Sequence, residues 1–326
     1  MKSRYLDILR EVEQEHQQGQ GSSKNSHLLV IDGLNTFIRV FSAVPALNDD
    51  GDHIGGVTGF LRSVAAVVRQ VKPTRCVIVF DGKGGSVRRK KLFPEYKANR
   101  ANKTSFNRYK EFASLQDEQE SMKRQYGRMI QYLQCLPITV LAIDQVEADD
   151  IIAYISNEIY TKDNERVTIC STDRDFLQLV NNRISVWSPI KKKMYTPELM
   201  KEEFGFSPEN YLMYRAFIGD KSDNIPGLNG VGAKSLIKHF PMFTEDREVS
   251  IDELVEHAET VEKQYKVHER VADGRVILER NYALMQLKEV DISGNAKLLA
   301  LDQVQRDINR MDVLEFKKMF MRDKMY

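Results

Sequence analysis

The stretch "RCVIVFDGKGGSVRRKKLFPEYKANR" spans residues 75–100 and combines an apolar segment with a strongly basic one. It begins with a continuous run of apolar, largely β-branched residues that ends at Asp81. Runs of this kind, bounded by turn residues, are typical of strands buried on both faces. Similar runs occupy residues 27–32, 137–144 and 166–173. The sequence therefore predicts a sheet built around these strands.

The segments between these runs have the spacing of amphipathic helices. Residues 57–71, 122–136 and 148–160 carry apolar side chains at every third or fourth position. Buried strands that alternate with such helices predict an α/β fold, in which a mostly parallel sheet is flanked by helices. In these sheets the functional site lies where the carboxyl ends of the strands meet the loops.

Acidic residues gather at that edge of the predicted sheet. They are Asp32, Asp81, Glu147, Asp149, Asp150, Asp173 and Asp175. Carboxylates brought this close together repel one another unless cations neutralise them. Oxygen ligands without histidine or cysteine favour Mg²⁺ or Mn²⁺ over zinc. Two such ions can promote hydrolysis of a phosphodiester, so the pattern predicts a metal-dependent phosphodiesterase site.

Each of these acids also has a purely structural interpretation. An aspartate after a strand is often the N-cap of the next helix, and this applies to Asp32 and Asp81. Asp149 and Asp150 could instead complement the dipole of the helix that they begin. The metal interpretation is favoured because separate segments of the chain bring acids to the same edge.

Charge is segregated along the chain. The 326 residues include 48 basic and 47 acidic side chains, which give a formal net charge of +1. Residues 83–110, however, contain ten cations and a single acid, Glu95. Such a segment favours binding to a polyanion, while a solvated and disordered loop is the alternative. The cysteines, Cys76, Cys135 and Cys170, have no CxxC spacing, which favours buried thiols in a reducing compartment.

The pattern divides the chain into segments. Residues 1–26 predict a short helix and a flexible linker, and residues 27–200 predict the α/β catalytic domain. After about residue 195, helices and glycine-rich turns replace the strands, so residues 201–326 predict a second, helical domain. Within it, Ser250 to Glu253 form a capping-box signature.

A glycine-rich turn follows two further acids, Asp220 and Asp223, in "GDKSDNIPGLNGVGAKSLIKHF". Gly230 and Gly232 could expose backbone N–H groups to a phosphate, and Lys234 could add a positive charge. The alternative is a turn between helices in which glycines allow close packing. The turn alone does not decide between them.

Five motifs in this order resemble the 5′-nuclease family. They are "LLVIDGLN", "VFDGKGGSVRRKKLFPEYKANR", "QVEADD", "STDRDFLQLV" and "GDKSDNIPGLNGVGAK". The family includes flap endonucleases, the 5′-nuclease domain of bacterial DNA polymerase I, and stand-alone bacteriophage 5′-exonucleases. Since no polymerase motifs accompany them, we expect the stand-alone phage-type enzymes to be the nearest kin.

The resemblance implies a PIN-like catalytic domain, a basic helical arch over about residues 83–125, and a helix-three-turn-helix element over about residues 211–240. It also implies two Mg²⁺ sites, in which Mn²⁺ can substitute. The implied ligands of the first are Asp32, Asp81, Glu147, Asp149 and Asp150. Those of the second are Asp173, Asp175, Asp220 and Asp223.

The resemblance further implies where a substrate binds. Lys97 and Arg100 would face the scissile phosphate as catalytic cations, beside the catalytic acids Asp81 and Glu147. Tyr96 would stack on a base. The expected contacts to the DNA backbone are Arg88, Arg89, Gly230, Gly232 and Lys234, with K⁺ expected at the glycine turn.

The expected function is that of a structure-specific 5′ nuclease, a 5′-3′ exonuclease and flap endonuclease that removes flaps or RNA primers during replication. Its expected partners are DNA with a 5′ flap, nick or free 5′ end, RNA–DNA hybrids, and a replication protein. We expect a monomer in the cytoplasm, or in the host cytoplasm if the chain is phage-encoded, with no membrane contact. The alternatives are an inactive protein that binds DNA junctions and a PIN-type single-strand ribonuclease.

Overall fold

The computed structural model describes residues 26–99, 105, 107–108 and 112–325. Arg100 and the helix expected within residues 1–26 lie outside the described residues.

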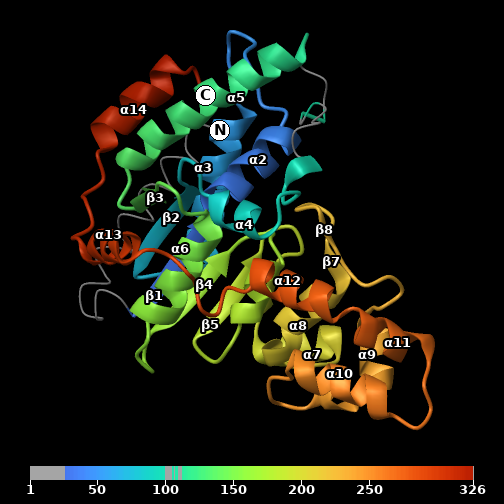
Figure 1. Cartoon of the computed structure of the whole chain (residues 1–326). Coiled ribbons are helices and arrows are strands. Elements are labelled where there is room, and N and C mark those ends of the chain that lie inside the picture. The colour runs from blue at the N-terminus through green and yellow to red at the C-terminus, as the bar shows by residue number, and fades with distance from the viewer. Residues whose placement is uncertain (1–25, 100–104, 106, 109–111, 326) are drawn as a thin grey trace.

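A mostly parallel sheet of six strands forms the centre of the molecule, in the order β3-β2-β1-β4-β5-β6 (Figure 1). The strands are β1 (His27–Asp32), β2 (Arg75–Asp81), β3 (Thr139–Ile143), β4 (Arg166–Cys170), β5 (Ile184–Ser188) and β6 (Lys193–Tyr195). All neighbours pair in parallel except β5 and β6. The first four strands confirm the prediction, whereas β5 and β6 were not predicted.

Helices cover both faces of the sheet because successive residues of each central strand point to opposite sides. In β1, Leu28 and Val30 belong to one apolar core, and Leu29 and Ile31 belong to the other. The second core is covered by α2 (Gly33–Ala43), α3 (Gly55–Val71), α5 (Leu115–Gln134) and α14 (Val313–Arg322). The first is covered by α6 (Ala148–Tyr154), the π-helical turn η3 (Ile155–Ile159), the 3₁₀ helix η4 (Asp175–Leu179) and α13 (Gly294–Gln305).

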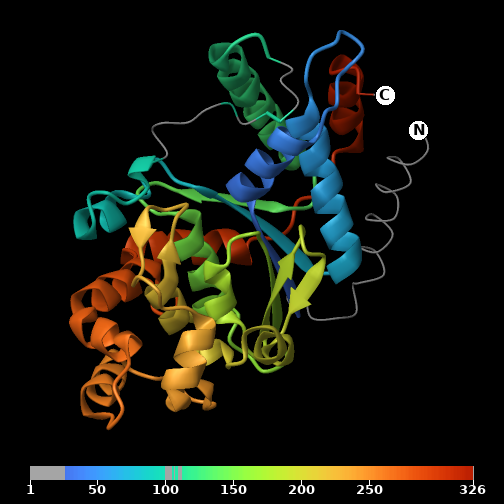
Figure 2. The ribbon, with the colours of Figure 1, turned by 90° about the vertical axis from the view of Figure 1, so that its right-hand side faces the viewer.

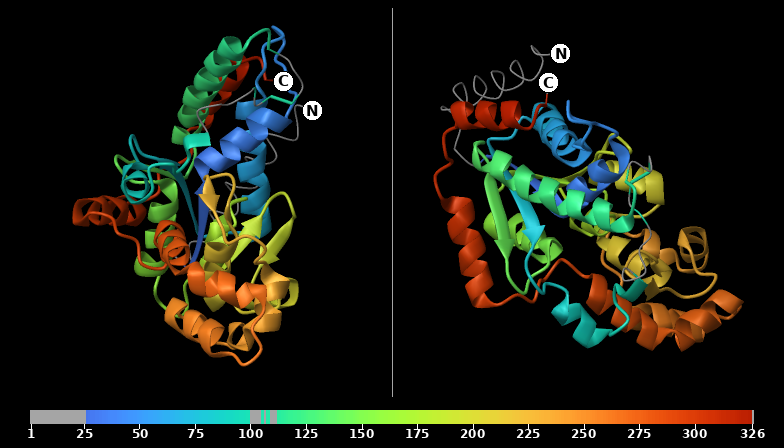
Figure 3. Two further views of the ribbon diagram at one scale, coloured as in Figure 1. Left: turned by 45° about the vertical axis from the view of Figure 1, so that its right-hand side comes forward. Right: turned by 90° about the horizontal axis from the view of Figure 1, so that it is seen from above.

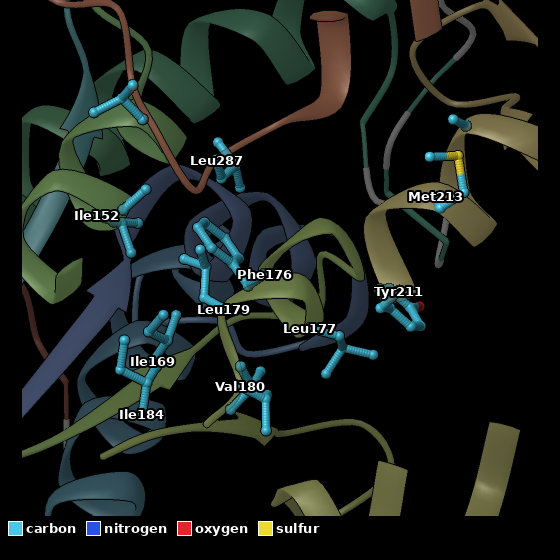
Figure 4. Packing of buried hydrophobic residues seen from close by; sticks show 14 of the residues in the cluster. Ile152, Ile169, Phe176, Leu177, Leu179, Val180, Ile184, Tyr211, Met213 and Leu287 are labelled. Atoms are coloured by element: carbon cyan, nitrogen blue, oxygen red, sulfur yellow. The ribbon is translucent and has the colours of Figure 1, made fainter. Parts of the chain in front are cut away.

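The helix η4 is fixed by its apolar side chains. Figure 4 shows Phe176 and Leu179 packed near Ile152 and Ile169, which come from α6 and β4. These side chains are fully or almost fully buried. The polar residues that flank the helix are therefore held in place by a rigid support.

The remaining elements form a helical layer beside the sheet. They are α4 (Val87–Leu92), α7 (Pro197–Phe204), η5 (Pro208–Asn210), α8 (Tyr211–Ile218), α9 (Ala233–His239), η6 (Pro241–Thr244), α10 (Ile251–Thr260), α11 (Lys266–Asp273) and α12 (Arg275–Met285). Ser250 caps α10, where its hydroxyl accepts a hydrogen bond from the Glu253 N–H at 3.1 Å, as the capping signature predicts. Although they are far apart in the sequence, α4 and α12 lie side by side (Figure 3).

Two short strands correct the expectation that no strands follow residue 195. β7 (Gly219–Asp220) and β8 (Ile225–Pro226) pair antiparallel and form a short ribbon near α4 (Figure 2). Strands of two residues carry no detectable periodicity, which is why the sequence pattern misses them. The ribbon holds the turn that contains Asp223 in a fixed place.

The last two helices return to the sheet. α13 lies beside β3, and α14 lies along α5 (Figure 1), where the rings of Phe316 and Tyr132 are 5.0 Å apart. One apolar core also runs without interruption from β1 to α13. The packing thus crosses the boundary expected at residue 200, and the division into domains stays a prediction.

Candidate active site

Asp32 links two neighbouring strands at the carboxyl edge of the sheet. Its Oδ1 accepts a hydrogen bond from the Asn35 N–H at 3.1 Å, which caps α2, and its Oδ2 accepts one from the Ser171 hydroxyl at 3.0 Å. Ser171 directly follows β4. Burial raises the pKa of Asp32 to about 7, although these two hydrogen bonds oppose the shift. The N-cap interpretation of Asp32 is thus confirmed, and the same carboxylate also lies at the predicted edge.

Asp81, the last residue of β2, also accepts a hydrogen bond from a main-chain N–H. Its Oδ1 accepts a hydrogen bond from the Ala148 N–H at 2.8 Å, at the start of α6. The bond brings the end of β2 to the helix that carries Asp149 and Asp150. The interpretation of Asp81 as the N-cap of the next helix is wrong, because α4 begins at Val87 with Ser86 at its N-cap. The carboxylate still lies at the edge where the acids were expected.

Asp173 and Asp175 lie on either side of the turn that leads into η4. The Asp175 N–H donates to the Asp173 Oδ1 at 2.8 Å. Burial raises the pKa of both, that of Asp175 to about 7, with neighbouring carboxylates adding to the effect.

Arg215 of α8 joins Asp175 to Asp220. Its Nε lies 2.6 Å from the Asp175 Oδ1, and its Nη2 pairs with the Asp220 carboxylate. Burial opposes ionisation of Asp220, but hydrogen bonds from Ser222 and the charge of Arg215 lower its pKa overall. The sequence interpretation did not include Arg215. A single cation in an otherwise apolar helix, five residues before Asp220, was the signal that could have identified it.

Lys97 lies between the two expected groups of metal ligands. Its Nζ is 2.5 Å from the Glu147 Oε1 and 3.9 Å from the Asp223 Oδ2. Burial raises the pKa of Glu147, but the positive charges of Arg89 and Lys97 lower it. The net effect is a pKa below the ordinary value of a glutamate. The predicted catalytic lysine therefore contacts one predicted acid of each group, Glu147 and Asp223.

Arg89 occupies a position that differs from the expected contact with DNA. Only 3% of the residue is exposed, and its guanidinium pairs with Glu147 and with both oxygens of Asp150. Its Nε also donates to the carbonyl oxygen of Leu284 at 2.9 Å. Buried carboxylates need a compensating charge, and Arg89 supplies one to Glu147 and Asp150. In this conformation the side chain is not accessible to a duplex.

Tyr96 also differs from its expected position on a base. The residue is 2% exposed, and its ring lies in a small apolar cluster with Phe93 and Leu212. Its hydroxyl donates to the Asp223 Oδ2 at 3.1 Å. Tyr96 therefore supports the acidic site from within the protein and presents no free ring face in this structure.

The donor set suits a hard divalent cation. Nine acids were expected here, and the described cations that pair with them are Arg88, Arg89, Lys97 and Arg215. Asp149, Asp175 and Asp223 line a cavity of about 10 Å³, which is enough for one water-sized guest. The excess of carboxylate oxygens fits Mg²⁺ or Mn²⁺. The cavity itself is also lined by Arg89 and by apolar side chains, so it does not mark an ion position. In the described part of the chain, however, no three acids, histidines or cysteines already have the arrangement of an ion site.

The glycines of the turn were interpreted either as sites of close packing or as exposed backbone that binds phosphate, and the structure gives different answers for different glycines. A Cβ on Gly227 would lie 2.4 Å from the carbonyl oxygen of Phe217, so packing explains this glycine. A Cβ on Gly232 would have nothing within 4 Å. Gly230 has a φ of +68°, and a Cβ there would lie 2.2 Å from the Arg270 guanidinium. Lys234 is exposed at the start of α9, so the open side of the turn carries Gly232 and Lys234.

Comparison with known proteins assigns the class. Residues 27–205 match the family described as 5′-3′ exonuclease, N-terminal resolvase-like domain, and the chain belongs to this family of nucleases. The 5′-3′ exonuclease of Aquifex aeolicus is 31% identical over 211 residues, which cover 64% of this chain and 67% of that protein. The DNA polymerase I of Bacillus caldotenax is 31% identical over 254 residues, which cover 75% of this chain and 27% of the polymerase. The chain thus spans about a quarter of the length of that polymerase.

Solved structures confirm the expected fold. The bacteriophage T5 flap endonuclease, in a complex with DNA and metal ions, superposes with a TM-score of 0.63 at 22% identity and covers 92% of this chain and 100% of that chain. The T5 5′-exonuclease with bound zinc gives a TM-score of 0.64 at 22% identity, with 91% and 99% covered. Over the residues that the structure describes, no helix has the length and apolar character needed to cross a bilayer.

Proposed function

We propose that this chain is a Mg²⁺-dependent, structure-specific 5′ nuclease that hydrolyses phosphodiesters near 5′ ends and flap junctions in DNA. The observation that carries the proposal is the position of Lys97 between Glu147 and Asp223, at an edge where acids from separate strands meet. Removal of flaps or RNA primers during replication is the matching cellular role.

Two divalent ions are the proposed cofactors. Asp32, Asp81, Glu147, Asp149 and Asp150 would hold one, and Asp173, Asp175, Asp220 and Asp223 would hold the other. When bound, the ions would supply an activated water and neutralise the charge of the phosphate. Arg89 and Arg215 pair with four of these acids and reduce the repulsion between them.

Lys97 is the proposed catalytic cation. Its ammonium group now pairs with Glu147, and it would exchange this partner for an oxygen of the scissile phosphate. A positive charge aimed at the phosphoryl oxygens stabilises the charge that develops there in the transition state. Arg100 is proposed as its companion.

Lys234 and the backbone of Gly230 and Gly232 are proposed to bind the duplex backbone, with K⁺ as a further proposed ligand of the turn. Of the two neighbouring arginines, Arg88 has the more exposed side chain, a quarter of which is exposed, and it is the one proposed to contact a phosphate. A DNA substrate with a 5′ flap, nick or free 5′ end, or an RNA–DNA hybrid, would extend from this turn to the acidic edge. We propose that the chain acts as a monomer and meets a replication protein.

A single experiment distinguishes the proposed nuclease from an inactive junction-binding protein and from a single-strand ribonuclease. The protein is incubated with end-labelled 5′-flap duplex, nicked duplex and single-stranded RNA, each with Mg²⁺ or with EDTA. Magnesium-dependent products from flap and nick support the proposal. Binding without cleavage identifies an inactive junction-binding protein, and cleavage of the RNA alone identifies a single-strand ribonuclease.

A further inference from the structure

The segment that carries Lys97 is attached to the turn that carries Asp223. The turn, residues 221–224, connects β7 to β8, and four hydrogen bonds join it to residues 95–99. One of them is the bond from the Tyr96 hydroxyl to the Asp223 carboxylate, and the other three involve the main chain. At the centre, the main-chain N–H of Lys97 donates to the carbonyl oxygen of Asp223 at 2.9 Å. The lysine and the acidic turn thus share a main-chain bond in addition to their facing side chains.

Two asparagines bracket this central bond from opposite segments. The side-chain amide of Asn224 donates to the carbonyl oxygen of Glu95 at 2.8 Å. In the reverse direction, the amide of Asn99 donates to the carbonyl oxygen of Lys221 at 2.9 Å. Each segment therefore supplies a side-chain donor to the main chain of the other.

The backbone on both sides of this contact is unusual. Lys97 has a φ of 57° and Asn224 has a φ of 60°. Asparagine adopts this left-handed region more readily than most residues, whereas lysine adopts it rarely. The conformation of Lys97 requires support from its surroundings, and the bonds from Asn99 and Asn224 lie on either side of it.

We propose that Asn99 and Asn224 are positioning residues that fix the catalytic lysine relative to the carboxylates of Asp220 and Asp223. They act through Lys97 and do not contact the reacting atoms. This inference rests on the proposed function of Lys97. Its consequence is that the base of the basic segment and the second group of acids move as one unit.

The test removes the two donors with little other change. Asn224→Gly keeps the left-handed backbone accessible, and Asn99→Ala removes an exposed amide. The double variant should lower the single-turnover cleavage rate of a 5′-flap duplex about 10- to 100-fold, since a small displacement of a catalytic group has effects of this size. Its affinity for the flap in EDTA should stay within about twofold of the wild type.

A double-mutant cycle distinguishes positioning from general stabilisation. In a Lys97→Ala background, loss of the two asparagines should cause no further decrease in rate, because the residue through which they act is absent. The control is Asn157→Ala, since the Asn157 amide donates to the carbonyl oxygens of Leu287 and Lys288 and does not touch the Lys97 segment. This control should cleave at the wild-type rate in both backgrounds.

A second readout does not depend on activity. In the metal-free protein, acetylation of each lysine by an amine-reactive reagent is followed by mass spectrometry. The double variant should raise labelling of Lys97 and leave that of the exposed Lys90 unchanged. Wild-type rate and wild-type labelling of Lys97, or an equal loss of rate with and without Lys97, would overturn the proposal. If Lys97→Ala itself cleaves normally, the catalytic role of Lys97 fails, and the labelling alone decides the positioning role.

Discussion

Arg89 and Asp150 form a two-bond ion pair inside the protein, with Nη1 2.9 Å from Oδ2 and Nη2 2.7 Å from Oδ1. Both side chains are 4% exposed. Because Arg89 also pairs with Glu147, its removal would take the shared counterion from two buried carboxylates. Among the described cations, Glu147 would keep only Lys97, and Asp150 would keep only the more distant Arg88. Breaking a buried pair in this way typically destabilises a protein by about 3–5 kcal/mol.

We therefore expect Arg89→Met to lower the free energy of unfolding of the metal-free protein by about this amount, as measured by urea denaturation in EDTA. Arg89→Lys should lose less stability than Arg89→Met, because the lysine keeps a positive charge near Glu147 and Asp150. The matched control is Arg88→Ala. The Arg88 side chain is a quarter exposed and its Nη2 is 3.7 Å from Asp150, so this variant should lose less than about 1 kcal/mol of stability. Equal stabilities of Arg89→Met and Arg88→Ala would refute the counterion role.

The stability of the metal-free protein should depend on pH in a direction set by Asp32 and Asp175. Both have a pKa of about 7 in the folded protein, raised by burial from 3.8. The folded state then binds more protons than the unfolded chain between these values, so stability falls as pH rises from about 4 to about 7. Urea midpoints in EDTA should follow this trend.

Magnesium should reduce or reverse this trend, because the ion favours the deprotonated carboxylates. His27 has a pKa lowered by burial and contributes a slope of opposite sign. It does so with and without the ion, so the difference between the two series reports on the acidic site. Parallel pH profiles in Mg²⁺ and EDTA would argue against metal binding by these acids.

Lys97→Ala should depress turnover much more than binding. A cation that acts mainly in the transition state contributes about 10²- to 10³-fold to the rate. Single-turnover cleavage of a flap substrate measures this loss, and anisotropy in EDTA measures binding. Lys90→Ala, an exposed cation in the same basic segment, should retain a near-normal rate at moderate salt. A variant of Lys97 that only weakens affinity would reduce this residue to an ordinary backbone contact.

Lys234→Ala should weaken binding to a blunt duplex and reduce the slope of log affinity against log salt by about one unit. Lys238→Ala changes an exposed lysine one turn later on α9 and should leave the slope as in the wild type. The slopes are obtained by titration at several salt concentrations. The same slope for Lys234→Ala and wild type would place Lys234 outside the interface.

Much of the sheet could be predicted because β1 to β4 are continuous apolar runs, which few other structures explain. β5 was missed because "ISVWS" is short and its serines interrupt the apolar run that marks the other parallel strands. The helix α5 begins at Leu115, earlier than predicted, because Ser114 caps it through a hydrogen bond from the Asp117 N–H at 3.1 Å. Such local caps precede the apolar stripe and are invisible to its periodicity.

The acids near the ends of β1 to β4 could be predicted to lie at one edge, because strand ends in a parallel sheet share an edge whatever the details of packing. Asp220 and Asp223 were assigned to the site only through the family resemblance. The partners of these acids could not be predicted. Charge pattern alone does not distinguish a solvated arginine from a buried counterion, so Arg89 was assigned to DNA. The hydrogen bond between Asn224 and Glu95 joins residues 129 positions apart, and only the fold brings them together.

Cleavage by an Asp173→Asn variant tests the central claim most directly. A 5′-flap duplex labelled at its 5′ end is mixed with excess protein and Mg²⁺, and the product is followed in a single turnover. We predict that the wild type releases the flap and that the variant is slower by more than about 100-fold, because metal ions contribute several kcal/mol to the transition state. Its flap affinity in EDTA should remain that of the wild type. Wild-type cleavage by Asp173→Asn, or no magnesium-dependent product from the wild type, would contradict the account.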